Sequence, residues 1–319
     1  MISRLLFFVL VAILIGGCAA SLPKTRDSKP VTGNRFEEST VSINDFPTGE
    51  PSSMMELPRT PDGGFVLSPG FYEAEFKTYC LQPGTPDPRQ GDAYLQGPVT
   101  GYRKDIIESV LLNSKSYPDM NQRNVQLLLW SVVSGSDFNK LSSPVKNDAM
   151  KLLTPKQVFQ LKGGVMGVIK TVSGSTGLLK GNGEMKRLFE TGINSYESFE
   201  RLAVLKEPAQ IKRKGVKYDQ WYKQSEKYYL RYFPVSYQKV RIQVYVPAGL
   251  LDSNNLSGGE YIVFDPTGQQ AIPAFTNAQR LGIGAPVIDV VKAVINVTKK
   301  NGTKKTVTKR MEEKAPAKE

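Results

Sequence analysis

The sequence predicts an α+β protein: a mixed strand and helix N-terminal domain, a helical and basic middle region, and a small C-terminal domain resembling a β-sandwich. Three patterns lead to this prediction. Apolar and polar residues alternate in GFYEAEFKTYC and in KVRIQVYV, which is the period of a half-buried strand. Apolar residues recur at helical spacing in DIIESVLLN and NVQLLLW. With 40% hydrophobic residues, the 319-residue chain has enough apolar material for folded cores.

The first 17 residues are typical of a bacterial lipoprotein signal peptide. Arg4 precedes an apolar run from Leu5 to Ile15, which is too short to span a bilayer, and IGGC leads directly to a cysteine. We therefore expect the peptide to be removed and Cys18 to carry a lipid anchor in the membrane. The next residue, Ala19, is not an aspartate, and resemblance to Gram-negative lipoproteins then favours the outer membrane.

Residues 18–67 are rich in Pro, Ser, Thr and charge and show no periodicity, so we expect a lipidated flexible tether. The alternative is an irregular extension that packs on the folded part. The remaining chain divides into an α+β domain at 68–165, a helical basic and aromatic region at 166–234, a small β domain at 235–298, and a disordered basic tail at 299–319.

Within 68–165, the alternation predicts a strand that ends at Cys80 with this side chain pointing inward. A loop rich in Pro and Gly follows, and then a helix that stops before Pro118. Asp119 and Gln122 have the spacing of a capping box for a second helix. On that helix Gln126 and Trp130, four residues apart, share one stripe. The apolar faces of the two helices are formed by Ile106, Ile107, Val110 and Leu111, and by Val125, Leu128, Leu129 and Val132.

The segment from Arg201 to Arg231 interleaves aromatic residues with Lys and Arg, as a surface for glycan or phosphate would. The simpler alternative places the aromatic rings in the core and the lysines on a solvated face. The candidate polyanion-binding residues are Lys212, Arg213, Lys214, Lys217, Trp221 and Tyr222.

Charge and composition exclude several functions. The net charge of +12 favours anionic envelope polymers such as lipopolysaccharide, and nucleic acid is not an expected partner of a lipid-anchored protein. The chain has no histidine, which excludes a Ser-His-Asp triad and histidine-ligated metal sites. We expect no metal and no cofactor. With Cys18 acylated, Cys80 has no partner for an intramolecular disulfide, so it is either an inert buried residue, paired between chains, or used chemically.

Residues 68–138 resemble the thioester domains of bacterial surface adhesins. The resemblance rests on YCLQPGTPDPRQGDAYL, the helix IIESVLLNS, the following YP, and VQLLLW, which has the hydrophobic-Gln-x-x-hydrophobic-Trp pattern. It implies that Cys80 and Gln126 join as an internal thioester with loss of ammonia, and that Tyr79 and Trp130 shield the bond. Such a bond captures an amine of a surface target and needs no histidine.

Three functional hypotheses follow. The first is a covalent adhesin of the cell envelope, which is a binder and not a turnover enzyme. The second is a structural lipoprotein of a secretion or appendage assembly, with Cys80 as an ordinary buried residue, that binds peptidoglycan, lipopolysaccharide or a protein. The third is a glycan-cleaving enzyme acting through carboxylates, for which no acidic pair stands out; Glu73 and Glu75 lie on the outward stripe of a strand.

Overall fold

The computed structural model describes residues 46–101, 103–163, 180–192, 195–211, 218–225, 227–248 and 262–288. These residues form both helices and strands, so the predicted α+β class is confirmed. The strands are β1 (Ser52–Ser53), β2 (Phe65–Leu67), β3 (Gly70–Cys80), β4 (Thr85–Pro86), β5 (Tyr94–Pro98), β6 (Val204–Leu205), β7 (Tyr222–Ser225), β8 (Tyr228–Ser236), β9 (Lys239–Val246), β10 (Ile262–Phe264), β11 (Gln269–Pro273) and β12 (Leu281–Pro286).

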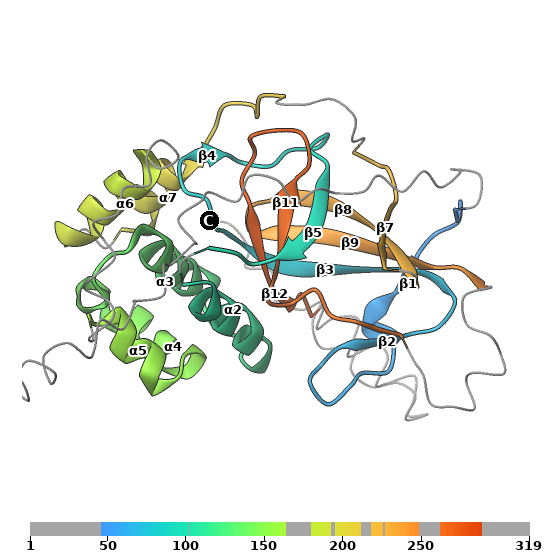
Figure 1. The fold of residues 1–319 in the computed structure, drawn as a ribbon, viewed down its shortest axis with the longest axis horizontal. Coiled ribbons are helices and arrows are strands. Elements are labelled where there is room, and N and C mark those ends of the chain that lie inside the picture. Colours follow the sequence, from blue (N-terminus) through green and yellow to red (C-terminus); the bar gives the residue numbers. More distant parts are fainter. Residues whose placement is uncertain are drawn as a thin grey trace, which may run out of the picture.

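Six α-helices are described, with three short 3₁₀ turns between elements. The α-helices are α2 (Lys104–Asn113), α3 (Gln122–Ser134), α4 (Ser143–Leu152), α5 (Pro155–Leu161), α6 (Lys180–Glu190) and α7 (Tyr196–Ala203), and the 3₁₀ turns are η2 (Met54–Glu56), η3 (Ser114–Ser116) and η4 (Phe138–Lys140). The helices gather at one end of the sheet (Figure 1). The two helices predicted before and after Pro118 are confirmed as α2 and α3, and their expected apolar faces are buried.

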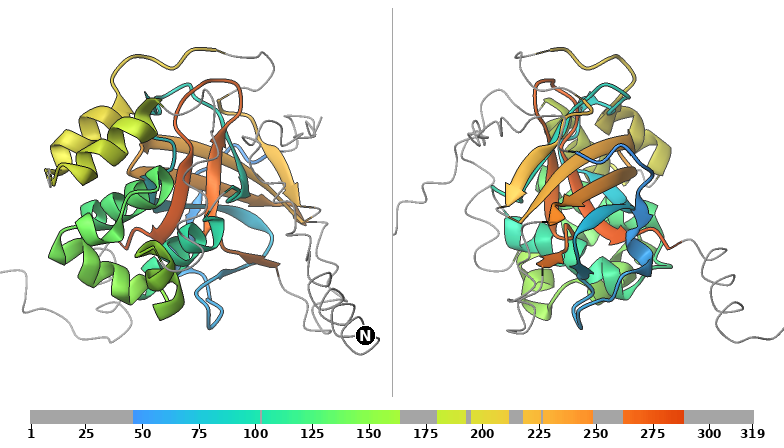
Figure 2. Two further views of the ribbon diagram at one scale, coloured as in Figure 1. Left: turned by 60° about the vertical axis from the view of Figure 1, so that its left-hand side comes forward. Right: turned by 90° about the vertical axis from the view of Figure 1, so that its right-hand side faces the viewer.

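One eight-stranded sheet forms the centre of the molecule, in the order β5–β11–β12–β3–β9–β8–β7. β1 pairs in parallel with the first half of β3, and the other neighbours in the sheet are antiparallel. The first strand of this order approaches the second-last one, since the Tyr232 hydroxyl of β8 donates a hydrogen bond of 2.5 Å to Gln96 of β5. The sheet therefore curls nearly into a barrel (Figure 2).

This sheet corrects the expected domain division. β3 and β5 belong to the predicted domain at 68–165, but both neighbours of β3, β9 and β12, come from the region at 235–298. No separate small β domain exists in the described residues of that region. Among its described residues, the middle region at 166–234 is helical in α6 and α7, and it continues as β6, β7 and most of β8. Strands from across the chain thus share one main core, with a small second cluster formed by Ala93, Leu95, Tyr222 and Ala274.

The expected tether is wrong for the residues that the structure describes between 46 and 67. Met54, Phe65 and Leu67 are 0%, 1% and 3% exposed, and they belong to the main core. β2 pairs with β10 and so joins this segment to the C-terminal part of the chain. The alternative, an extension that packs on the folded part, holds here. Residues 18–45, like the signal peptide and the basic tail at 299–319, lie outside the described residues.

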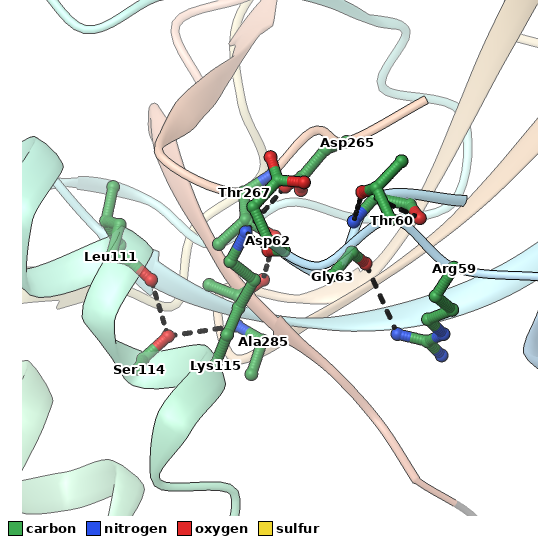
Figure 3. A network of polar contacts seen from close by, with 12 residues as sticks. Arg59, Thr60, Asp62, Gly63, Leu111, Ser114, Lys115, Asp265, Thr267 and Ala285 are labelled. Carbon is green, nitrogen blue, oxygen red and sulfur yellow. Dashed lines mark hydrogen bonds and ion pairs between the residues drawn. The ribbon is translucent and has the colours of Figure 1, made fainter. Parts of the chain in front are cut away.

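Hydrogen bonds and one ion pair hold residues 46–67 in place (Figure 3). The Lys115 ammonium donates to the Asp265 carboxylate at 2.6 Å and to the Asp62 carbonyl at 2.7 Å. Beside it, the Ser114 hydroxyl accepts a hydrogen bond of 3.1 Å from the Ala285 backbone N–H. Both side chains are on η3, so this turn ties the 46–67 segment, the residue after β10, and β12 to the end of α2.

The start of α3 also differs in detail from the prediction. Its N-cap is Asn121, whose side-chain oxygen accepts from the Arg123 backbone N–H at 2.9 Å, so the capping box expected from Asp119 and Gln122 is wrong. The Gln122 side chain points instead to the sheet. The helix ends at Gly135, whose φ of 68° lies in the left-handed region that glycine adopts without strain.

Candidate thioester site

Cys80 is the last residue of β3 and is 0% exposed. The inward orientation predicted from the alternation is confirmed for this residue. Thr78 and Tyr79 are also buried, and because successive side chains of a strand point to opposite faces, both faces of the sheet are covered at this end of β3. The Tyr79 ring lies against Gly284 of β12, where an added Cβ would come within 2.7 Å of the ring.

The two edges of β3 differ at Cys80. On one side β12 continues alongside, with Leu281 as the partner of Cys80. On the other side β9 pairs only as far as Lys77, and the turn before β9 adds one bond, from the Thr78 N–H to the Gln238 carbonyl at 2.8 Å. The backbone of Cys80 is therefore without a strand neighbour on this edge.

Two glutamines of α3 form hydrogen bonds with the backbone at the edge of β3 that has no strand neighbour. Gln122 Nε2 donates to the carbonyls of Thr78 at 3.1 Å and Gln238 at 2.7 Å. One helical turn further on, Gln126 Oε1 accepts from the Cys80 N–H at 2.8 Å, and Gln126 Nε2 donates to the Cys80 carbonyl at 3.0 Å. The carboxamide of Gln126 thus takes the place of a neighbouring peptide unit. The structure brings Cys80 and Gln126, 46 residues apart, into direct contact.

Trp130 lies one turn beyond Gln126 and is 0% exposed. Its indole Nε1–H finds no acceptor of normal hydrogen-bond geometry in the described residues. The same N–H is directed to the Cys80 thiol closely enough to lower the pKa of that thiol. Burial has the larger and opposite effect and raises the pKa of Cys80 to about 12, so the free thiol is uncharged at neutral pH.

Two tyrosines cover the indole ring of Trp130. The ring centroids of Tyr196 and Tyr237 are 5.5 Å and 6.5 Å from that of Trp130, with interplanar angles of 31° and 28°. Their hydroxyls are 2.8 Å apart, and the Tyr237 hydroxyl donates to Glu200. Burial and these hydrogen bonds raise the pKa of Tyr237 well above its ordinary value. The buried Cys80–Gln126–Trp130 group is thereby covered by α7 and by the β8–β9 turn.

Sequence reasoning missed this covering layer. Tyr196 and Glu200 are four residues apart on α7, a spacing that places both on one helix face. Nothing in the local sequence links that face to Tyr237, because the turn after β8 reaches α7 only through the tertiary fold. The contact of Gln122 with the sheet was also missed, because its spacing from Asp119 indicated a helix cap.

The other predicted site residues lie elsewhere or outside the described part. Cys18, Lys212, Arg213, Lys214 and Lys217 fall outside the described residues. Trp221 and Tyr222 are only 6% and 8% exposed, so the expectation that their rings offer an open face for a glycan is wrong. The Trp221 ring stacks on Phe46 at 5.5 Å and lies under the Arg231 guanidinium at 4.4 Å. The alternative, that these aromatic rings belong to a packed layer, holds for both.

The two acids considered in the sequence, Glu73 and Glu75, form ion pairs, and the described residues contain no candidate metal site. Glu73 and Glu75 are paired with Arg241 at 3.5 Å and Lys239 at 3.0 Å on the outer face of the sheet. No group of three Cys, Asp or Glu residues in this part of the chain could hold a metal ion. Nor does a described helix have the length and apolar character needed to cross a membrane.

No protein-family model matches the chain, and searches of curated proteins and of solved structures find no significant match. The geometry of the site is therefore the basis for a functional proposal.

Proposed function

We propose that this chain is a lipid-anchored protein of the cell envelope that captures amines covalently through an internal thioester between Cys80 and Gln126. The observation that carries the proposal is the pair of hydrogen bonds that fixes the Gln126 carboxamide to the backbone of Cys80, at 2.8 Å and 3.0 Å. The sulfur and the carbonyl carbon belong to groups already held together. Because the carboxamide is fixed beside the residue that carries the sulfur, less conformational entropy is lost when the two side chains react.

The bonds that form and break belong to these two side chains and to an amine. In the first step the Cys80 sulfur attacks the carboxamide carbon of Gln126, the C–N bond breaks, and ammonia leaves with the thiol proton. In the second step an amine nitrogen attacks the thioester carbon, the C–S bond breaks, and the Cys80 thiol re-forms with a proton from the amine. Burial of the pair favours this chemistry because it limits hydrolysis by water.

Access to the bond requires movement of the covering layer. Cys80 and Gln126 are 0% and 1% exposed, and Tyr196 and Tyr237 are 7% and 4% exposed. Two surface clefts, one around 116–121 and one between Gly135 and Lys162, include neither member of the pair. An amine would enter where α7 and the β8–β9 turn cover Trp130.

The second candidate is a structural envelope lipoprotein without covalent chemistry. The same two hydrogen bonds favour it, since the Gln126 amide satisfies the backbone of Cys80 at an open sheet edge and buried polar groups need such partners. In both candidates Cys18 anchors the chain, the outer membrane is the proposed location, and the positive charge attracts anionic envelope polymers.

An intact-mass measurement separates the two candidates. For a purified chain that begins at Ala19, and so contains Cys80 as its one cysteine, covalent capture predicts a mass lower than the sequence mass by one ammonia, and methylamine treatment should add one methylamine. Cys80→Ala and Gln126→Ala should each have the full mass of their sequences and add nothing. Gln160→Ala, which removes a helical amide far from Cys80, should behave as the wild type. A full wild-type mass, with one thiol that titrates after unfolding, would leave only the structural candidate.

A further inference from the structure

Asp87 is a half-buried carboxylate in the Pro-rich loop that follows Cys80. Its backbone N–H donates to the Leu205 carbonyl at 3.1 Å, which holds it beside β6. One carboxylate oxygen, Oδ1, accepts from the Tyr237 backbone N–H at 2.9 Å. Because Tyr237 binds Oδ1, Oδ2 is the oxygen of this carboxylate to which we assign a further donor.

The fold places this carboxylate close to the candidate thioester. The residue before it, Pro86, accepts a hydrogen bond of 3.0 Å from the Gln279 N–H. Gln279 is two residues before Leu281, the sheet partner of Cys80, which corresponds to about 7 Å along an extended chain. From the other side, Asp87 is bonded to Tyr237, whose ring covers Trp130. The carboxylate is near enough to Cys80 for its charge to raise the pKa of the thiol.

Other charged groups face Asp87 as well. Lys206, Arg89 and Glu200 are its electrostatic neighbours, and burial has the largest effect and raises the pKa of Asp87 above its usual range. A carboxylate with a raised pKa is a stronger base than an exposed one. The chain has no histidine to serve as a base near neutral pH.

We propose that Asp87 is the general base of the thioester chemistry, and that its Oδ2 binds the incoming amine and takes the proton that this amine loses. The proposal rests on the function proposed above. During capture the amine proton passes to Asp87 as the C–N bond forms, and Asp87 returns it to the sulfur as the C–S bond breaks. Formation of the thioester from Gln126 is the reverse of a reaction in which the thioester captures ammonia. The same carboxylate therefore carries the thiol proton to the leaving ammonia.

Asp87→Asn tests this role because loss of the negative charge and loss of the general base should change the capture rate in opposite directions. The variant keeps an Oδ1 acceptor for the Tyr237 N–H but removes the negative charge and the base. Through charge alone, the pKa of Cys80 would fall, the thiolate would leave more easily, and capture would be faster. Loss of a general base instead predicts slower chemistry, by roughly 10²-fold or more. Glu197→Gln, on the exposed surface of α7, is the matched control for loss of a carboxylate.

The experiment follows both steps on the whole purified chain by intact mass. We expect Asp87→Asn either to lose ammonia incompletely or to add methylamine roughly 10²-fold more slowly, with Asp87→Glu intermediate and Glu197→Gln unchanged. Complete loss of ammonia together with wild-type or faster capture by Asp87→Asn would overturn the base role and leave the thioester standing. If the wild type shows no loss of ammonia, the proposed function itself fails.

A pH profile of the wild type gives a second test, which stands even if Asp87→Asn does not fold. Methoxyamine remains largely uncharged between about pH 6 and pH 9, so its own protonation does not shape the profile. The capture rate should fall as the pH drops through the raised pKa of Asp87, because the base becomes protonated. A rate that, after correction for the protonation of methoxyamine, stays constant down to about pH 4, the ordinary pKa of an aspartate, would contradict the proposal.

Discussion

At the scale of single residues, the side chain of Gln126 replaces the strand that β3 lacks at its end. The alternation in the sequence predicted the burial of Cys80, and the motif resemblance paired it with Gln126. Their contact through the Cys80 backbone could not be predicted, because it depends on where β9 stops, three residues before Cys80. The same holds for Asp87 and Tyr237, which meet through tertiary packing alone.

Replacing Gln126 should be costly even where no thioester forms. In a Cys80→Ala background, Gln126→Leu leaves the backbone N–H and carbonyl of residue 80 buried without partners, and each orphaned group costs about 1–3 kcal/mol. We expect the free energy of unfolding to fall by about 2–5 kcal/mol in urea titrations. Gln160→Leu in the same background should change it by less than about 0.5 kcal/mol. Equal effects of the two substitutions would show that the backbone contacts contribute no stability.

At the scale of elements, patterns with a clear period were predicted well. β3, α2 and α3 each bury the residues that the alternation or the helical spacing singled out. Short elements within irregular sequence were not predicted. β2 and η2 have only three residues each, which is too few to show the apolar repeat of a strand or a helix. The segment 46–67 was taken for a tether because its polar composition hides a few residues that belong to the core.

Phe65→Ala tests the place of this segment in the fold. Phe65 is 1% exposed and its ring is 6.1 Å from that of Phe76, so its truncation should leave a cavity. We expect a loss of about 3–5 kcal/mol in the free energy of unfolding, measured by chemical denaturation. Val263→Ala on the partner strand β10, where Val263 is 38% exposed, serves as the control and should cost far less. A Phe65→Ala protein as stable as the wild type would restore the tether interpretation for these residues.

At the scale of the whole molecule, one curled sheet collects strands from both halves of the chain. Local periodicity shows that a strand exists but not which strand lies beside it. For this reason the sequence suggested two β-containing domains where the described strands share one main sheet. The consequence for function is that the candidate site is a product of the complete fold. Cys80 comes from β3, Gln126 from α3, and the cover of Trp130 from α7 and the turn between β8 and β9.

The central claim is that Cys80 and Gln126 are joined, and locating the captured amine tests it most directly. The purified protein is treated with isotopically labelled methylamine, unfolded, alkylated at free thiols and digested, and the peptides are sequenced by mass spectrometry. The account predicts the label as an N-methyl amide at Gln126, with Cys80 alkylated only after methylamine treatment. An unlabelled Gln126, together with a Cys80 thiol that is alkylated after unfolding in the untreated protein, would contradict it.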